Sequence, residues 1–329
     1  MNEVKAIKFS SYLSELIIEF IAEKRSVGYK FIKGASLLKQ LDQFLVSEQH
    51  LTDIKLTKET VLLWTKKRPH EKENTRSKRI SIIRGLAEYM IRLGYEAYIY
   101  PTFAVKIGRY DYTPYIFSEE EIRKIFAVCD SYPTSNVSPN RHLIMPLLFR
   151  ILYACGLRIS EALNLTLDDV NLEKGTLIIH ETKFDKERII PMAKSLIEQC
   201  CEYMEKVHSF EKETTFLFPS PYGGHYCTNT VYNWFRDILW KAGISHSGQG
   251  PRLHDVRHTF SVHCLKRWVL KGEDLTNLLP YLSVYLGHED LRGTQRYLRL
   301  TADLYPSIIE SVEKNYSDLI PEATKNETD

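Results

Sequence analysis

The sequence predicts a mainly α-helical protein with one small β-hairpin, divided into a helical N-terminal domain and a mixed α/β C-terminal domain. Apolar residues recur at helical spacing through most of the 329 residues. Short alternating segments at 176–180 and 188–190 flank a turn, as expected for a hairpin. A chain of this length is sufficient for two domains with separate cores.

Four helices are expected within residues 1–94, which we interpret as one helical domain. Apolar stripes at residues 9–21 and 37–45 predict the first two helices. Thr57, followed by an apolar run, indicates a short third helix. The fourth is expected to open near residue 74 and to end at Gly94.

The charge is distributed unevenly along the chain. Residues 1–117 contain 20 Lys and Arg and 13 Asp and Glu, a net charge of +7, and the remaining 24 basic and 29 acidic residues give −5. A basic N-terminal part suits a polyanionic partner, although solvated helical domains often carry a similar excess. Basic side chains cluster around the loop before the fourth helix: Lys66, Lys67, Arg68, Arg76, Lys78 and Arg79.

Cysteine spacing and hydropathy argue against several classes of protein. The six cysteines have no Cys-x-x-Cys spacing, so we expect reduced core residues in a cytoplasmic protein and neither a disulfide framework nor a metal site. The apolar run at 144–155 is interrupted by Pro146 and Arg150 and is too short to cross a bilayer. Neither a membrane association nor a cofactor is expected.

The second domain is expected at residues 118–300, after an extended linker at 95–117. Ser118 and Glu121 have the spacing of a capping box, which begins a helix. A later helix at 142–155 is apolar nearly all round and is therefore expected to be central.

Arg158 follows this central helix directly after Gly156 and Leu157. An unpaired guanidinium at the end of a buried helix is costly, so Arg158 needs a partner or a bound anion. Glu161, one turn further on, is a candidate for a simple salt bridge. Both interpretations stay open at this level.

The largely apolar segment at 253–298 also contains a small set of candidate polar residues. His254 and Arg257 lie one turn apart on an expected helix that has no breaker until Gly272. His288 follows Leu286 and Gly287, and Tyr297 comes nine residues later.

A short helix is expected to carry Tyr297. Gly293 is interpreted as the stop of the preceding helix and Thr294 as the N-cap of the new one. Tyr297 would then lie in the first turn, where a helix favours a phosphate.

Together these motifs resemble those of the tyrosine site-specific recombinases, the phage-integrase and Xer-like family. The run Tyr153–Leu163 is similar to the first arginine box of the family, and Thr182–Pro191 is similar to its β-hairpin lysine motif. His254 and Arg257, then Leu286–His288, then Tyr297 follow the order of its C-terminal signature. The resemblance extends from Phe117 to about Leu300.

The resemblance implies how the phosphate would be held. Arg158 and Arg257 would neutralise its non-bridging oxygens, and His288 would add a hydrogen bond. Glu161 would support the first arginine from behind.

The resemblance also implies the chemical steps. Tyr297 would attack phosphorus and form a 3′-phosphotyrosine, and His254 would take the phenolic proton as general base. Lys183, near the hairpin turn, would donate a proton to the 5′-hydroxyl leaving group. Without the resemblance, Lys183 is interpreted as a solvated charge.

The same family implies double-stranded DNA as partner, gripped by the N-terminal domain through the basic cluster at 66–79. Residues 301–329 combine an amphipathic stripe with a polar end that is expected to be disordered. This tail is expected to dock on a neighbouring protomer in a homo-oligomer, a tetramer on DNA, although it could equally fold back on its own domain. Two alternatives stay open: a type IB topoisomerase-like enzyme that relaxes DNA, and a DNA-binding module without catalytic activity.

Overall fold

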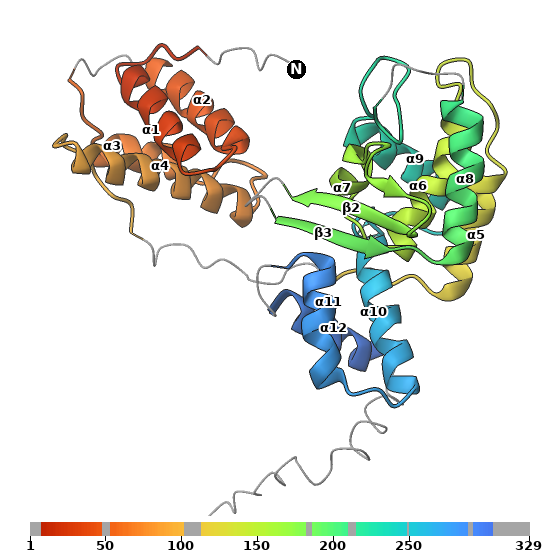
Figure 1. Cartoon of the computed structure of the whole chain (residues 1–329). Helices are drawn as coiled ribbons and strands as arrows, with labels where there is room; N and C mark the ends of the chain where they lie inside the picture. The colour runs from red at the N-terminus through yellow and green to blue at the C-terminus, as the bar shows by residue number, and fades with distance from the viewer. Residues whose placement is uncertain are drawn as a thin grey trace, which may run out of the picture. The chain divides into compact units, whose positions relative to one another are not determined.

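The computed structural model describes residues 8–47, 53–101, 113–181, 186–209, 215–248, 250–288 and 292–304. The chain divides into two compact units, Met1–Tyr112 and Thr113–Asp329 (Figure 1). The first unit is helical in its described part, and the second combines helices with a small antiparallel sheet. The predicted fold class is therefore confirmed.

The described part of the first unit contains the four expected helices. They are α1 (Ser14–Ser26), α2 (Ile32–Ser47), α3 (Lys58–Thr65) and α4 (Glu73–Arg92). Thr57 caps α3 as predicted, because its side chain accepts a hydrogen bond from the Thr60 amide at 3.2 Å. The apolar stripes meet in one core, in which Phe20, Leu38 and Trp64 are at most 2% exposed.

In the second unit, helices and a small sheet contribute to one core. The elements are α5 (Glu119–Asp130), α6 (Arg141–Ala154), α7 (Ile159–Asn164), β1 (Val170–Asn171), β2 (Thr176–Glu181), β3 (Lys186–Pro191), α8 (Lys194–His208), α9 (Thr228–Lys241), α10 (Asp255–Leu270), α11 (Leu275–Leu286) and α12 (Arg292–Leu304). The capping box of Ser118 and Glu121 begins α5, as expected. Helix α6 is buried along most of its length and forms the centre of the core.

The β-hairpin prediction is confirmed, and the structure adds a short strand to it. β2 pairs with β3 in antiparallel register, with His180 opposite Glu187, and β1 pairs with the other edge of β2. The long β2–β3 ribbon is prominent in Figure 1. The turn at 182–185 lies outside the described residues, and it includes Lys183.

Helices α10, α11 and α12 pack together at the C-terminal side of the second unit (Figure 1). Residues 275–285, an apolar segment whose structure the sequence did not indicate, belong to α11 and include Pro280. The helix ends at Gly287, which adopts a left-handed conformation with φ 63°. None of the described helices is long and apolar enough to cross a membrane.

The expected boundary before Tyr297 is wrong. Helix α12 already includes Arg292, so Gly293 and Thr294 lie inside it and Tyr297 is in its second turn. Thr294 does not cap the helix, because its buried hydroxyl is within 2.8 Å of Nδ1 of His288. The orientation of the Thr294 side chain is therefore determined by its contact with His288 and not by capping of α12.

The two ends of the expected linker at 95–117 pack on different units. The Tyr98 amide donates to the Leu56 carbonyl at 2.8 Å, and Tyr100 is buried in the core of the first unit. Phe117 is fully buried in the core of the second unit. Residues 102–112 between them lie outside the described residues.

Candidate active site

A glycine turn brings Arg158 out of the core at the end of α6. Gly156 has φ +59°, and a Cβ atom there would lie 2.4 Å from Cδ1 of Phe260. Both the left-handed backbone and the close ring favour glycine at this position. The chain can therefore pass closely over α10 and place Arg158 at the start of α7.

Glu161 accepts hydrogen bonds from more than one guanidinium. Its Oε1 accepts from Nη1 of Arg158 at 2.6 Å, which is the salt bridge that the sequence suggested. Its Oε2 accepts from the Arg158 amide at 2.7 Å and from Nη2 of Arg188 at 2.8 Å. Nη1 of Arg257 lies 3.7 Å from the same oxygen.

The electrostatics of this cluster favour an anionic ligand. Burial alone would raise the pKa of Glu161, but the charge of Arg188 and the hydrogen bonds from Arg158 and Arg188 hold it below its usual value. Three guanidinium groups against one carboxylate leave an excess of two positive charges among these four side chains. A phosphodiester, which carries one negative charge, suits such a cluster.

The C-terminal end of α11 holds Arg158 and Arg257 side by side. Nη2 of Arg158 donates to the Gly287 carbonyl at 3.0 Å, and Nη2 of Arg257 donates to the Leu286 carbonyl. The last carbonyls of a helix have no partner within the helix, so they are free to accept from these cations. Nη1 of Arg257 also donates to the Gly156 carbonyl at 2.9 Å.

Arg257 is fixed more firmly than Arg158. It is 2% exposed, whereas the Arg158 side chain is 35% exposed. Burial and the nearby charge of Arg158 lower the pKa of Arg257 to about 10, which leaves it charged at neutral pH. Arg158 is therefore the more accessible of the two cations.

Two histidines of α10 and its N-cap stack beside these arginines. The rings of His254 and His258 meet edge to face, with 4.7 Å between their centroids. Part of the His254 ring is exposed, but the protein packed around it and the charges of Arg257 and Arg158 lower its pKa to about 4. His254 is therefore neutral at pH 7 and can accept a hydrogen bond.

Tyr297 points into this cluster from α12. Its hydroxyl oxygen lies 3.0 Å from Nδ1 of His258, and the residue is 3% exposed. Burial raises the pKa of Tyr297, and the neighbouring Arg257 opposes that increase. The His288 ring is stacked near the Tyr297 ring, with centroids 6.1 Å apart, and its Nδ1 is engaged with Thr294.

The structure thus gathers most of the predicted catalytic residues into one site. Arg158, Glu161, Arg257, His254, His288 and Tyr297 are connected through the contacts given above. Lys183 lies outside the described residues.

Two further residues of this site were not singled out from the sequence. Arg188 binds Glu161 and lies within the segment already compared with the lysine motif. His258 binds Tyr297 and stands one helical turn after His254, a spacing that could have drawn attention to it.

The basic cluster of the first unit is only partly available to a ligand. Lys66, Lys67, Arg68 and Lys78 are exposed, and Arg76 is half-buried with its Nε donating to the Thr65 carbonyl. Together with Trp64, the side chains of 66–68 line a cavity of about 660 Å³.

Arg79 was expected to contact phosphates, and the structure contradicts this. It is 1% exposed, and its Nε and Nη2 donate to the two carboxylate oxygens of Glu71 at 2.7 Å each. It also donates to the carbonyls of Trp64 and Lys66. Arg79 therefore stabilises the α3–α4 loop. Its charge and its donors are already satisfied by the protein, so it is not available to a phosphate.

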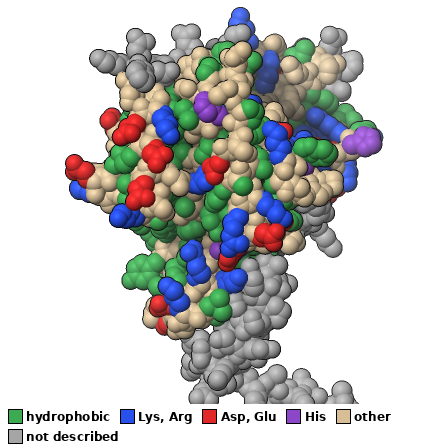
Figure 2. Space-filling model, turned by 90° about the vertical axis from the view of Figure 1, so that its right-hand side faces the viewer, with side chains coloured by type: hydrophobic (Ala, Val, Ile, Leu, Met, Phe, Trp, Pro, Cys, Tyr) green, Lys and Arg blue, Asp and Glu red, His purple; other side chains and the backbone are tan. Residues whose placement is uncertain are grey.

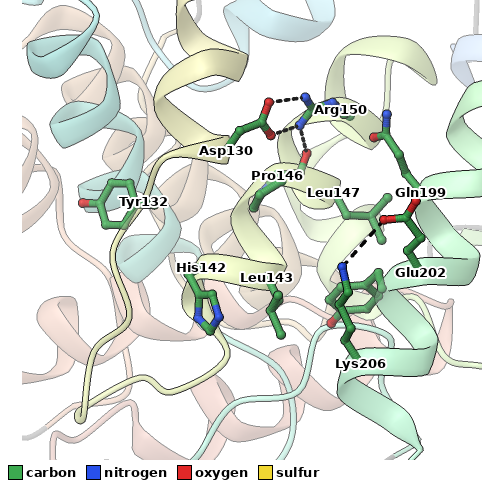
Figure 3. Close-up of a pocket in the computed structure, with 11 residues that line it drawn as sticks. Asp130, Tyr132, His142, Leu143, Pro146, Leu147, Arg150, Gln199, Glu202 and Lys206 are labelled. Atoms are coloured by element: carbon green, nitrogen blue, oxygen red, sulfur yellow. Dashed lines mark hydrogen bonds and ion pairs between the residues drawn. The ribbon is translucent and has the colours of Figure 1, made fainter.

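A separate cavity of about 380 Å³ lies on the second unit between α5, α6 and α8 (Figure 3). Its cations face carboxylates: Arg150 binds Asp130 at 2.7 Å, and Lys206 lies 3.7 Å from Glu202. Figure 2 similarly displays a face on which acidic and basic side chains are interspersed. The cavity thus lacks the positive excess of the arginine cluster.

Comparison with known proteins identifies the family. The sequence profile described as "Phage integrase family" matches residues 116–303. The predicted integrase/recombinase y4rB of Sinorhizobium fredii is 27% identical over 316 residues, which cover 94% of this chain and 99% of that protein. Tyrosine recombinase XerA of Pyrococcus furiosus is 30% identical over 206 residues, covering 60% of this chain and 61% of XerA.

Solved structures agree in fold. The XerH site-specific recombinase bound to difH substrate in a pre-cleavage complex has a TM-score of 0.61 at 20% identity, covering 90% of this chain and 84% of XerH. A lambda integrase dimer bound to a COC′ core site has a TM-score of 0.57 at 15% identity, covering 85% and 96% of the two chains. The chain therefore belongs to the phage integrase family and is a DNA breaking-rejoining enzyme of the tyrosine recombinase type.

Proposed function

We propose that this chain recombines DNA at specific sites through a 3′-phosphotyrosine formed on Tyr297. The observation that carries the proposal is the common support of Arg158 and Arg257, both of which bind Glu161 and the end of α11. Tyr297 lies beside Arg257, so a phosphate held by the arginines would meet the phenolic oxygen. Preorganised cations of this kind stabilise the charge that develops on phosphate oxygens.

The proposed cleavage step conserves the phosphodiester bond energy. The Tyr297 oxygen forms a bond to phosphorus, the bond from phosphorus to the 5′-oxygen breaks, and that oxygen takes a proton from Lys183. Attack of a 5′-hydroxyl from another strand reverses the step and joins the two strands. His254 takes the phenolic proton of Tyr297 as general base, and His288 donates a hydrogen bond to a phosphate oxygen.

We propose double-stranded DNA as the partner of both units. XerH and lambda integrase, which share this fold, were solved with difH substrate and a COC′ core site respectively. The helical domain at 1–94 would contact phosphates through Lys66, Lys67, Arg68 and Lys78, which are exposed. The catalytic domain at 118–300 follows the linker at 95–117.

We further propose that a homo-oligomer, a tetramer, assembles on DNA through the C-terminal tail. The sequence after α12 carries apolar residues at helical spacing, among them Ile308, Ile309 and Val312. These residues lie outside the described ranges. The biological outcome of the reaction would be integration, excision or resolution of DNA.

The test requires a substrate, which can be selected from a pool of random duplexes by electrophoretic retention with the full chain. A nick near the cleavage point turns the selected duplex into a suicide substrate, because the short released strand diffuses away. The wild type is expected to form a protein–DNA adduct that survives denaturing electrophoresis. Tyr297→Phe should bind the duplex normally and form no adduct, since the phenolic oxygen is lost.

Tyr281→Phe is the matched control, because Tyr281 is 72% exposed on α11 and lies outside the arginine cluster. It should form the adduct at the wild-type rate. An adduct that persists in Tyr297→Phe would refute the assignment of the nucleophile. Relaxation of plasmids that lack the selected sequence would indicate a topoisomerase-like enzyme, and binding without any adduct in the wild type would indicate a DNA-binding module.

A further inference from the structure

His258 stands directly against the proposed nucleophile. It occupies the turn of α10 that follows His254 and adjoins Arg257, and its half-buried ring faces Tyr297 with 5.5 Å between centroids. Its Nδ1 lies 3.0 Å from the Tyr297 hydroxyl oxygen, which is an ordinary hydrogen-bond distance. None of the three sequence motifs assigns a role to this residue.

Both partners of this hydrogen bond keep their neutral form at pH 7. Burial, His254 and Arg296 lower the pKa of His258 to about 3, so the ring is neutral and one of its nitrogens is an acceptor. Burial raises the pKa of Tyr297, so the phenol keeps its proton. Arg257, a second neighbour of the phenolic oxygen, can only donate. Ser261, a further neighbour, already donates its own hydroxyl proton to the Arg257 carbonyl at 3.0 Å. Nδ1 of His258, at 3.0 Å from the phenolic oxygen, is the nitrogen that can accept the phenolic proton.

We propose that His258 is a positioning residue for the nucleophile: it accepts the hydroxyl proton of Tyr297 in a hydrogen bond and leaves the oxygen lone pairs directed toward Arg257. The proposal rests on the assignment of Tyr297 as nucleophile. A hydroxyl that rotates freely about its C–O bond presents a lone pair to phosphorus only part of the time. A hydrogen bond that fixes this rotation raises the fraction of productive orientations.

In the proposed role, His258 orients the hydroxyl proton of Tyr297 but does not take it up. The pKa of His258 lies far below that of Tyr297, so transfer from the phenol to the ring is strongly unfavourable. His254 is exposed in part, and its ring meets that of His258 edge to face. His258 thus contacts both the proposed nucleophile and the histidine that the family resemblance implies as base.

Three substitutions distinguish a hydrogen-bond acceptor role of His258 Nδ1 from a role of the ring in packing alone. His258→Leu removes the acceptor, His258→Asn places an amide oxygen near the position of Nδ1, and His258→Gln carries its amide further out, toward the position of Nε2. The readouts are the single-turnover rate of adduct formation on the nicked, selected duplex and the affinity for that duplex, with thermal unfolding as a check of folding.

We expect His258→Leu and His258→Gln to slow adduct formation on the order of 10-fold to 100-fold at unchanged DNA affinity, as a misplaced reacting group does. His258→Asn should recover most of the rate. Ser261→Ala is the control, because Ser261 is the other hydroxyl-bearing neighbour of Tyr297 and its own hydroxyl donates to the Arg257 carbonyl at 3.0 Å. This variant should react at the wild-type rate.

The proposal is overturned if His258→Leu reacts at the wild-type rate, if His258→Asn is as slow as His258→Gln, or if Ser261→Ala is the slow variant. Should His258→Leu fail to fold, the comparison of Asn with Gln decides the question alone. These results are distinct from an adduct that persists in Tyr297→Phe, which would refute the assignment of the nucleophile itself.

Discussion

Arg188 donates a hydrogen bond from Nη2 to Oε2 of Glu161 at 2.8 Å and so ties β3 to α7. The carboxylate that it binds also holds Arg158 and lies 3.7 Å from Arg257. Both partners are largely buried, with side chains 10% and 8% exposed. The β2–β3 hairpin is therefore connected through one carboxylate to both arginines of the proposed phosphate site.

Replacing Glu161 by Gln should destabilise the protein and slow cleavage. The substitution keeps the shape but leaves Arg188 and Arg257 without their buried counter-charge, which typically costs about 3–5 kcal/mol. Urea unfolding would measure the change. Asp130→Asn is the control: Asp130 also binds an arginine but is 51% exposed, so its loss should cost no more than about 1 kcal/mol. Equal effects of the two substitutions would contradict the importance of burial.

Cleavage is expected to proceed without a divalent cation. Arg158 and Arg257 already supply the positive charge that a metal would bring to the phosphate oxygens. The rate of adduct formation on the nicked duplex should be the same in excess EDTA as in magnesium. If EDTA abolished the reaction and magnesium restored it, the two arginines could not be the only source of positive charge at the phosphate.

The stability contributed by His180 should depend on pH. Nε2 of His180 lies 2.6 Å from Oδ1 of Asp169, and Nδ1 lies 2.6 Å from Oε1 of Glu187. A neutral imidazole has only one N–H, so both carboxylates are satisfied only when the ring is protonated. The hydrogen bonds to Asp169 and Glu187 raise the pKa of His180 above 6.5.

Because this pKa is raised on folding, the contribution is fully present below pH 6.5 and is lost as the pH rises through the folded-state pKa. The difference in melting temperature between the wild type and His180→Gln should therefore be larger at pH 6 than at pH 9. A difference that stays constant over this range would mean that protonation of His180 is not linked to folding. The ring is half exposed, so the effect should be modest.

Removal of the tail after Leu304 should separate DNA binding from assembly. The cut lies at the end of α12, so Tyr297 and the helix that carries it are retained. The truncated chain should bind the selected duplex and form the adduct, but joining of two duplexes should decline. Native electrophoresis and light scattering with the duplex would report the assembly. Unchanged assembly by the truncated chain would show that the tail folds back on its own protomer.

Much of the local structure could be read from the sequence, because it depends on residues close together in the chain. The caps at Thr57 and Ser118 depend on residues three positions away. The helical stripes and the alternation of the hairpin likewise depend on residues within a few turns or in adjacent strands. The resemblance of the arginine, histidine and tyrosine motifs to those of the tyrosine recombinases likewise predicted the family. The pair of Arg158 and Glu161, three residues apart, was within reach of the same reasoning.

Only the tertiary structure decided contacts between segments far apart in the sequence. His258 and Tyr297 are separated by 39 residues, and Arg188 and Glu161 by 27, so no local pattern links them. Arg79 was predicted to be a surface charge, but the α3–α4 loop buries it against Glu71. The physical reason is that burial and hydrogen-bond satisfaction depend on which surfaces meet, and that is fixed only when the helices pack.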